Sequence, residues 1–423
     1  MNASKLLIDT MAKLKPFLIK IIPLSFLSKM KKKYMLRNIK NLKKENIQPF
    51  DPKAFPMGIN LIGNIRGDSG LGQSCRLVAK ELQASKIPFL VYEHHISDAF
   101  SMNNHSCDDM IQDELKYAIN LFHINPHEFA VSYMQLGKKV WDKHYNIAFW
   151  LWETEEFPEE WIGCIDILDE IWTPAEFVSE AVRKVTNKPV YTVPYHVEAP
   201  IDTKYDRKHF GLPEDKFLYL MMYDSKSMME RKNPISVLNA FKKAFDKDDN
   251  AVGLVIKMNG RNEEDLAQIQ RLMDGYENIY FMTETLPKVE VNSLIACVDV
   301  FVSLHRAEGF GLVMAEAMLN GTPCIATNWS ANTEFMNSDV ACMVNYKMIA
   351  LDHEIGPYKK GSHWADADVN EAAMYMRKLA DDKTLYEQMS HEAKTYIEQV
   401  LGMKSVTEKI ENRVEEIYEI SNE

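Results

Sequence analysis

Two acidic side chains eight positions apart, Glu308 and Glu316, are the residues of this sequence best suited to chemistry. Glu316 falls in an otherwise apolar stretch, LVMAEAML, where a lone carboxylate is costly to bury unless hydrogen-bond donors reach it. The two hydroxyl groups of a ribose would supply such donors. The alternative is that Glu316 is an exposed helix residue and that Glu308 is only an acidic side chain favoured before a helix start.

The sequence between the two glutamates predicts an anion site. Gly309 and Gly311 mark a turn between a strand and a helix that we expect over about 312–320, with Gly321 as its stop. The first turn of a helix has N–H groups without partners and carries the positive end of the helix dipole, so a diphosphate can bind there. The glycines would let the backbone approach this ligand closely.

A group of cations precedes another expected helix. In YDSKSMMERKNP, Lys226 follows a strand, and Arg231 and Lys232 come directly before an Asn-Pro pair that can start a helix. Two cations at a helix entrance suit a diphosphate, although a solvated run of charges would look similar. Lys257 ends the apolar strand AVGLVIKM and is a further candidate, unless its ammonium group only reaches out to solvent.

Composition bounds the class of protein. The 423 residues are 46% apolar and 26% charged, which is enough for two ordinary globular domains. The net charge of −12 argues against general nucleic-acid binding. The six cysteines show no metal-ligand spacing, so we expect neither zinc nor a disulfide framework, and a cytoplasmic location fits best. The Asp-Ala-Asp sequence at 366–368 is assigned to a loop rather than a metal site.

Residues 1–47 differ from the rest of the chain. About a dozen Lys and Arg residues face only Asp9 and Glu45, and they alternate with aliphatic and aromatic residues as in interfacial membrane helices. Lysines and prolines interrupt every apolar stretch, so no uncharged stretch of the segment is long enough to span a bilayer. It also lacks the cleavage site of a signal peptide. We expect peripheral attachment to an anionic membrane surface, with a partner-binding or solvated arm as the alternative.

From residue 57 onward, short apolar stretches alternate with helical ones, which indicates parallel sheets. Strands are expected in MGINLIG, FLVYE, FAVSYM, IAFWLW, EIWTP and VYTVPY, and again in FLYLMMY, AVGLVIKM, NIYFMT, VDVFVSL and PCIAT. The restart after a proline-containing segment at 194–213 predicts two similar α/β units, with ligands at the carboxyl ends of their strands. A helix pair broken at Gly402 is expected over about 385–420.

Two further motifs have competing interpretations. Gly67, Gly70 and Gly72 lie between a strand and a helix, which is close to a dinucleotide-binding fingerprint, but the order GxxGxG and the longer loop disfavour NAD or FAD. Five tryptophans between residues 141 and 172 are mostly explained by core packing. Glu153, which follows the strand IAFWLW, is a candidate for contact with a sugar or acceptor, whereas His196 is better explained as a hinge residue than as a base.

The segment from Glu308 to Glu316 resembles the Glu-x7-Glu signature of retaining nucleotide-sugar glycosyltransferases with the GT-B architecture, sometimes called family 4. The blocks SLHRAEGFGL, NWSANTEFM, GPYKKGSHWADAD and DEIWTPAEFV are similar to a bacterial branch associated with surface-polysaccharide assembly. The resemblance covers about 57–400. It implies two doubly wound Rossmann-like domains that face a central cleft, with a C-terminal helix crossing back to the first domain. The expected domains are 1–47, 48–196, 197–400 and 401–423.

The resemblance also implies roles for residues. Glu308 would meet the hydroxyl groups of the donor sugar, Glu316 the ribose, and Lys232 and Lys226 the diphosphate. The family usually has an arginine where Lys226 stands, and lysine lacks the bidentate fork. The segment at 69–72 resembles a loop that faces the donor phosphates and would cap the leaving group. The other residues that we expect at the donor are Gly309, Phe310, Gly311, Leu312, Arg231, Gly70, Gly72, Lys257 and Thr283.

The implied activity is transfer of a sugar, with retention, from a UDP or GDP donor to a glycan or lipid-linked acceptor hydroxyl, in cell-surface polysaccharide or glycoconjugate assembly at the inner membrane face. No cofactor, metal or nucleic acid is expected. No residue stands out as a covalent nucleophile, which fits a same-face displacement in which the departing phosphate helps deprotonate the acceptor. Two alternatives are a catalytically silent GT-B domain that binds a partner or glycan, and a nucleotide-sugar epimerase.

Overall fold

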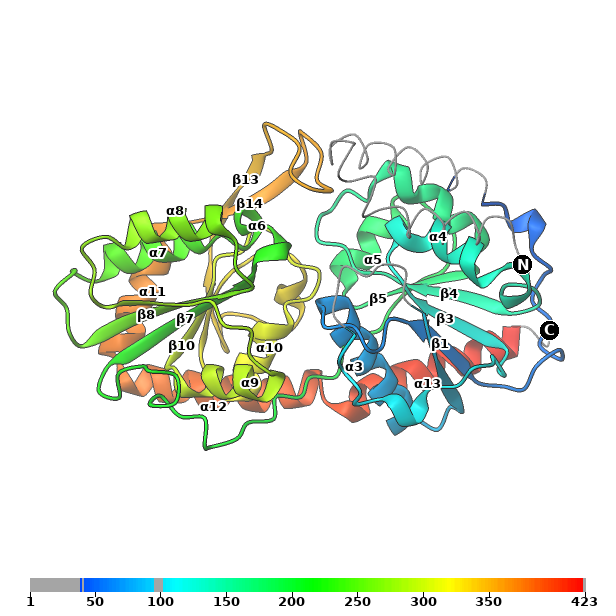
Figure 1. Cartoon of the computed structure of the whole chain (residues 1–423), viewed down its shortest axis with the longest axis horizontal. Coiled ribbons are helices and arrows are strands. Elements are labelled where there is room, and N and C mark those ends of the chain that lie inside the picture. The colour runs from blue at the N-terminus through cyan, green and yellow to red at the C-terminus, as the bar shows by residue number, and fades with distance from the viewer. Residues whose placement is uncertain (1–38, 40–41, 95–101, 421–423) are drawn as a thin grey trace, which may run out of the picture. The chain divides into compact units, whose positions relative to one another are not determined.

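The computed structural model describes residues 39, 42–94 and 102–420, and these fall into two compact units (Figure 1). The first unit comprises the described residues up to Leu151, Glu156–Tyr195 and the residues from Val406 onward. The second comprises Trp152–Glu155 and His196–Ser405. Four residues from the first half of the sequence therefore pack as part of the second unit.

The first unit is built on a parallel sheet with the strand order β2-β1-β3-β4-β5-β6. Its strands are β1 (Ile59–Gly63), β2 (Phe89–Glu93), β3 (Ile119–His123), β4 (Tyr145–Phe149), β5 (Glu170–Thr173) and β6 (Val190–Thr192). Helices α3 (Gly70–Ala84) and α13 (Met403–Ile420) cover one face, and α4 (Pro126–Leu136) and α5 (Glu176–Arg183) cover the other (Figure 1). The predicted doubly wound arrangement is confirmed.

Helix α13 returns to the first unit, as the resemblance implied. Its apolar stripe is buried, and Arg413 reaches the carboxylate of Glu170 in β5 with two hydrogen bonds of 2.8 and 2.6 Å. The side chain of Glu170 is fully buried and also accepts hydrogen bonds from Tyr145 and Trp172. A buried carboxylate needs such partners, so this ion pair fixes the helix to the sheet.

The described end of the basic N-terminal segment also belongs to the first unit. Ile39, Leu42 and Ile47 are buried, and Lys44 forms an ion pair with Asp169 at 2.7 Å. The predicted boundary at residue 47 is therefore too late, because these residues pack against the fold. The predicted membrane-surface arm otherwise lies outside the described residues. Among the residues that were described, no helix is long and apolar enough to cross a membrane.

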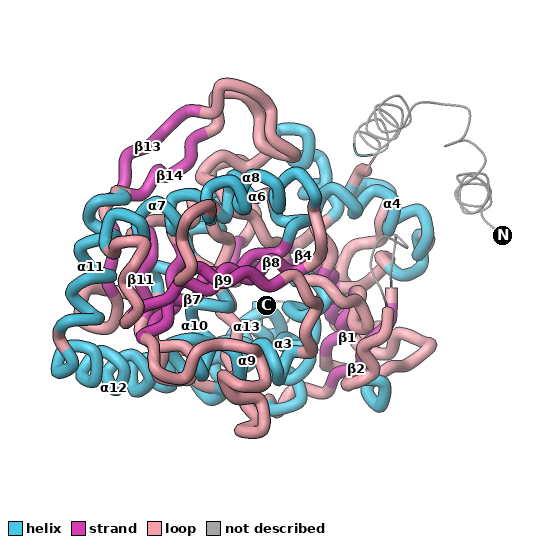
Figure 2. Tube along the Cα trace, turned by 60° about the vertical axis from the view of Figure 1, so that its left-hand side comes forward, coloured by secondary structure: helices cyan, strands magenta, loops and turns pink. Residues whose placement is uncertain are grey.

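The second unit has its own parallel sheet, in the order β12-β11-β10-β7-β8-β9. Its strands are β7 (Phe217–Asp224), β8 (Val252–Asn259), β9 (Ile279–Met282), β10 (Val300–Ser303), β11 (Cys324–Thr327) and β12 (Cys342–Val344). Helices α7 (Pro234–Ala244), α8 (Glu263–Met273) and α11 (Val369–Asp381) cover one face; α9 (Lys288–Cys297), α10 (Leu312–Leu319) and α12 (Lys383–Val400) cover the other, as Figures 1 and 2 show. Burial on both faces explains why these strands read as continuous apolar runs.

An antiparallel hairpin interrupts the α/β alternation of the second unit. Strands β13 (Tyr346–Ala350) and β14 (His363–Ala367) stand apart from the six-stranded sheet in both views (Figures 1 and 2). The interpretation of 366–368 as a loop was wrong, because Asp366 lies in β14, with an oxygen 2.9 Å from Arg306. Asp368 caps the start of α11.

Two local predictions in the first unit were wrong. The stretch FAVSYM lies in helix α4, which starts at Pro126, and the strand before it is β3, which we missed. A short, mostly apolar run does not distinguish a strand from a buried helix, and the proline at the first helical position was the better signal. Gly70 and Gly72 lie in the first turn of α3, capped by Ser69, rather than in the segment between the strand and the helix.

Candidate functional site

The loop between β10 and α10 places Glu308. Its neighbour His305 is buried and lies 3.0 Å from Asn332 Oδ1, and the N–H of Glu308 donates to Ser330 Oγ at 3.1 Å. These bonds join the loop after β10 to the loop after β11. Burial lowers the pKa of His305, so its imidazole is neutral and acts as a structural hydrogen-bonding group.

Two glycines in this loop are required by geometry. A Cβ atom on Gly309 would lie 2.8 Å from the carbonyl oxygen of Trp152, so a larger residue would displace that segment. Gly311 has a φ of 98° and is the residue before α10, where it supplies no side-chain cap. The N–H of Met314 donates to the carbonyl oxygen of Gly311 at 3.0 Å, whereas no side-chain cap from Gly311 covers the N–H groups of Leu312 and Val313, which can donate to an external acceptor as expected for an anion site.

The short helix α6 (Met229–Lys232) brings two cations to Glu308. Lys232 forms an ion pair with Oε1 of Glu308, and Nη1 of Arg231 lies 3.7 Å from Oε2. Arg231 also donates to the carbonyl oxygen of Ala307 at 2.8 Å. The helix ends at Asn233, whose φ of 57° is left-handed and whose side chain donates to the carbonyl oxygen of Leu304 at 2.9 Å. The Arg-Lys pair is thus fixed against the loop that carries Glu308.

The charges of this cluster settle its ionisation. Burial alone would raise the pKa of Glu308, but the positive charges of Lys232 and Arg231 outweigh it and lower the pKa to about 2. Burial lowers the pKa of Lys232, an effect that Glu308 opposes and Arg231 reinforces. Glu308 is therefore a carboxylate at neutral pH. It can accept hydroxyl groups but cannot act there as an acid.

Glu153 belongs to the same cluster, although it precedes Glu308 by more than 150 residues. Its Oε1 lies 4.0 Å from Nη2 of Arg231, and its Oε2 accepts a hydrogen bond of 3.1 Å from the hydroxyl of Tyr358. Tyr358 comes from the loop that joins β13 to β14, and it is buried. Sequence reasoning missed this tyrosine, since no spacing links it to the other site residues.

Glu316 lies on the buried side of α10 with only 2% of its surface exposed. Its Oε1 pairs with the ammonium group of Lys288, at the start of α9, at 2.5 Å. Its Oε2 is buried and has no hydrogen-bond partner among the described residues. Burial raises the pKa of Glu316, and Lys288 opposes that shift. The exposed-helix interpretation is wrong, and the unpaired oxygen fits a hydroxyl donor from a ligand.

Three other predicted cations and polar residues are placed differently. Lys226 is exposed on the 3-10 turn Ser225–Ser227 after β7. Lys257 is 1% exposed and donates to the carbonyl oxygen of Glu284 at 3.1 Å, so it does not reach out to solvent. Burial lowers its pKa. The N–H of Thr283 donates to the carboxylate of Glu284 at 3.1 Å.

The remaining predicted residues fall into packing or helix positions. Phe310 is buried against Phe335, with ring centroids 5.3 Å apart, and Leu312 is the first residue of α10. Gly70 and Gly72 lie in the first unit. His196, the first residue of the longer segment of the second unit, has Nδ1 3.2 Å from the carbonyl oxygen of Leu401.

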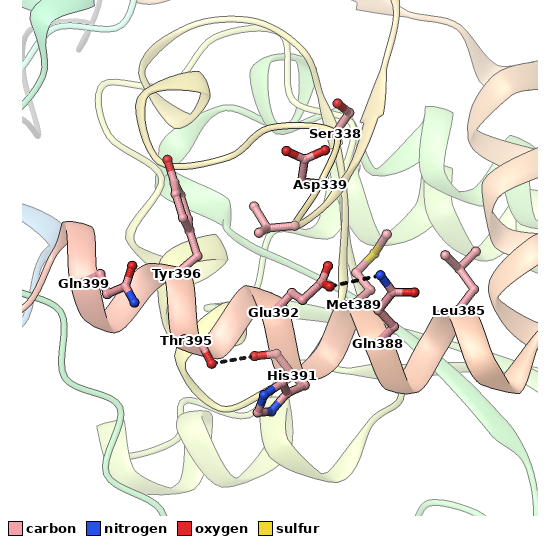
Figure 3. A pocket seen from close by; sticks show the side chains of 11 residues that line it. Ser338, Asp339, Leu385, Gln388, Met389, His391, Glu392, Thr395, Tyr396 and Gln399 are labelled. Atoms are coloured by element: carbon pink, nitrogen blue, oxygen red, sulfur yellow. Dashed lines mark hydrogen bonds between the residues drawn. The ribbon is translucent and has the colours of Figure 1, made fainter.

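A cavity of about 700 Å³ lies elsewhere, along α12 beside the loop at 338–340 (Figure 3). Two hydrogen bonds within the helix involve its side chains, with Gln388 donating to Glu392 at 2.9 Å and Thr395 donating to the carbonyl of His391 at 3.1 Å. It contains none of the predicted site residues. Among the described residues, no group of three or more His, Cys, Asp or Glu side chains is arranged to hold a metal ion.

Comparison with known proteins finds a family profile that matches the part of the chain carrying the charged cluster. Residues 202–396 match the sequence profile described as glycosyl transferases group 1. The matched segment lies wholly within the second unit and contains Arg231, Lys232, Glu308 and Glu316. No curated protein matches the sequence.

Solved structures share the fold at low sequence identity. HepE from Anabaena, in complex with UDP and glucose, is 10% identical with a TM-score of 0.62, over 85% of this chain and 100% of that one. A glycosyltransferase from Rickettsia africae is 12% identical with a TM-score of 0.64, over 85% and 98%. Sucrose-phosphate synthase from Thermosynechococcus elongatus is 12% identical with a TM-score of 0.61, over 86% and 100%. The predicted GT-B fold is thereby confirmed.

Proposed function

We propose that this protein transfers a sugar from a nucleoside diphosphate donor to an acceptor hydroxyl, with retention of the anomeric configuration and without a metal ion. The observation that carries the proposal is the unpaired Oε2 of Glu316, on the same short helix whose uncapped first turn follows Glu308. A ribose hydroxyl at Glu316, a diphosphate at the helix start and a sugar at Glu308 would follow the order of groups in a sugar nucleotide.

The main requirement of the reaction is stabilisation of the negative charge on the departing diphosphate. When the bond between sugar and diphosphate breaks, negative charge grows on the departing phosphate, and the N–H groups at the start of α10 together with Lys232 stabilise it. Burial strengthens these interactions, since the local dielectric is lower than in water. The ionised Glu308 accepts hydroxyl groups of the sugar. The acceptor itself is the nucleophile, and the departing phosphate takes its proton.

The donor is tested by incubating the purified protein with UDP-, GDP- and dTDP-sugars and measuring the release of nucleoside diphosphate. HepE was solved with UDP and glucose, which supports including UDP-glucose. We expect slow hydrolysis of one donor, retained in EDTA and lost in Glu308→Ala. In Glu316→Ala, donor binding should weaken by about 1.5–3 kcal/mol, the contribution of a hydrogen bond to a charged group. Absence of both release and nucleotide binding would instead indicate a catalytically silent, partner-binding protein.

We further propose that the acceptor is a glycan or lipid-linked saccharide at an anionic membrane surface. The support is the basic and apolar composition of residues 1–38. Sedimentation with vesicles of phosphatidylglycerol and phosphatidylcholine should recover the full chain, and a variant that starts at residue 39 should remain in the supernatant. This variant spares Ile39, Leu42 and Ile47, which are part of the core. Equal recovery of both proteins would contradict the proposal.

A further inference from the structure

The guanidinium group of Arg231 lies between two carboxylates. Its Nη1 is 3.7 Å from Oε2 of Glu308, and its Nη2 is 4.0 Å from Oε1 of Glu153. An arginine beside one carboxylate usually closes onto it with two parallel hydrogen bonds of about 2.7–2.9 Å. Here neither carboxylate is approached that closely. Nη1 instead donates to the carbonyl oxygen of Ala307 at 2.8 Å, and Nη2 faces Glu153 on the other side.

Tyr358 fixes the orientation of Glu153. Its hydroxyl donates to Oε2, which leaves Oε1 turned toward Arg231. Burial, reinforced by the charge of Glu153, raises the pKa of the Tyr358 phenol well above its usual value, so the hydroxyl keeps its proton and acts as the donor. The ring of Tyr358 packs against Trp152 and Trp364, with centroids 5.5 and 5.3 Å away.

The hairpin that carries Tyr358 is attached to the same loop and helix as the cluster. The N–H of Ala365 in β14 donates to the carbonyl oxygen of Arg306 at 3.0 Å, and the N–H of Arg306 donates to the carbonyl oxygen of Arg231 at 2.8 Å. Gly356, in the loop of the hairpin, lies so close to Met228 that a Cβ atom would overlap the methionine side chain. The position of Tyr358 is thus set by backbone contacts to α6 and to the loop of Glu308.

We propose that Glu153 and Tyr358 are positioning residues that hold Arg231 away from Oε2 of Glu308 and so keep that oxygen available for a hydroxyl of the donor sugar. This inference rests on the proposed function. Lys232 already occupies Oε1 of Glu308. If Arg231 closed onto Oε2, both oxygens would be bound by cations, and a sugar hydroxyl would have to displace one. The pair therefore determines recognition of the sugar, while the nucleoside and diphosphate are bound by other groups.

The test compares the sugar nucleotide that the wild-type protein hydrolyses with the corresponding nucleoside diphosphate, both by calorimetry. Tyr358→Phe and Glu153→Gln should bind the nucleoside diphosphate as wild type does. Both should lose at least about tenfold in affinity for the sugar nucleotide, the lower limit for a hydrogen bond to a charged group. Tyr346→Phe, in the same hairpin, is the matched control and should bind both ligands normally.

Two results would overturn the inference. One is an equal loss of affinity for both ligands, which would indicate a general structural role. The other is additivity in the double variant, because Tyr358→Phe should have no further effect once Glu153→Gln is present. A crystal structure of Glu153→Gln without ligand provides a readout that does not depend on the donor. It should show Arg231 within hydrogen-bond distance of Oε2 of Glu308, and an unmoved Arg231 would refute the inference even if no donor had been found.

Discussion

The ammonium group of Lys288 lies 2.5 Å from one carboxylate oxygen of Glu316, while the other oxygen of this buried side chain has no hydrogen-bond partner among the described residues. Lys288 is the positive charge that supports ionisation of Glu316, whereas burial and the negative charge of Glu198 favour the protonated acid. The lysine and the unpaired oxygen together are the basis for the proposed contact between Glu316 and a ribose hydroxyl.

Replacing Lys288 with Met should make nucleotide binding depend on pH. Without the lysine, the pKa of Glu316 rises further, so the side chain is protonated at lower pH and accepts a hydroxyl less well. The affinity of Lys288→Met for the nucleoside diphosphate should therefore increase with pH more steeply than that of wild type, measured by calorimetry. Lys288→Arg, which keeps the charge, is the control. If the affinity of Lys288→Met depends on pH in the same way as that of wild type, Lys288 does not act by keeping Glu316 ionised.

Glu308 should contribute to stability at neutral pH and lose that contribution in acid. Its folded-state pKa of about 2 lies below the reference value of 4.5, so the contribution is fully present above pH 4.5 and is lost as the pH falls toward 2. The shift corresponds to roughly 3 kcal/mol. Urea unfolding of wild type and Glu308→Gln should show a stability difference at pH 7 that narrows between pH 5 and pH 3. A difference that stays constant over this range would contradict the ionised pair.

Replacement by alanine should have different effects on stability at two glycines in the first turn of α3. A Cβ atom on Gly72 would lie 2.1 Å from the carbonyl oxygen of Gly67, whereas one on Gly70 would have no atom within 4 Å. We expect Gly72→Ala to lower the free energy of unfolding by about 1–3 kcal/mol, because the backbone must shift. Gly70→Ala should be neutral or stabilising by up to about 1 kcal/mol. Urea denaturation measures the free energy of unfolding of both variants. Equal effects at the two sites would show that the backbone of the turn accommodates a Cβ atom at Gly72.

The ion pair between Arg413 and Glu170 should be a large contributor to the stability of the first unit. Arg413→Met leaves a fully buried carboxylate without its charge partner, which typically costs about 3–5 kcal/mol. Glu416→Ala removes the other, half-exposed partner of Arg413, and its cost should stay below about 1 kcal/mol. Thermal unfolding followed by circular dichroism compares the two variants. A small effect of Arg413→Met would mean that the hydrogen bonds from Tyr145 and Trp172 suffice for Glu170.

The sequence predicted the sheets and the loop of Glu308 because those signals are local. The glycines at 309 and 311 follow a strand and precede an apolar helix, and helix α10 begins where this pattern indicated. The same local reading failed at FAVSYM, where an apolar run packs as a helix. It also failed for β14, because a short hairpin inserted between β12 and α11 does not follow the alternation of strand and helix.

The partners of the charged residues were not predictable, because they come from distant parts of the chain. Nothing in the spacing of Lys288 and Glu316 marks them as a pair, since two separate helices bring them together. Tyr358 meets Glu153 across 205 positions. Residue types and local motifs identified which groups carry charge, whereas three-dimensional packing determined which of those charges are balanced and which oxygen remains open.

The return of α13 to the first unit has a consequence for synthesis on the ribosome. Domains generally fold as they emerge, the N-terminal one first. Here the first unit lacks Val406–Ile420 until all of the second unit has been translated. Until then, the carboxylate of Glu170 has no ion pair with Arg413. The unit that begins the chain is therefore the last to be completed, and the nascent protein exposes the apolar surface that α13 will cover throughout translation of the second unit.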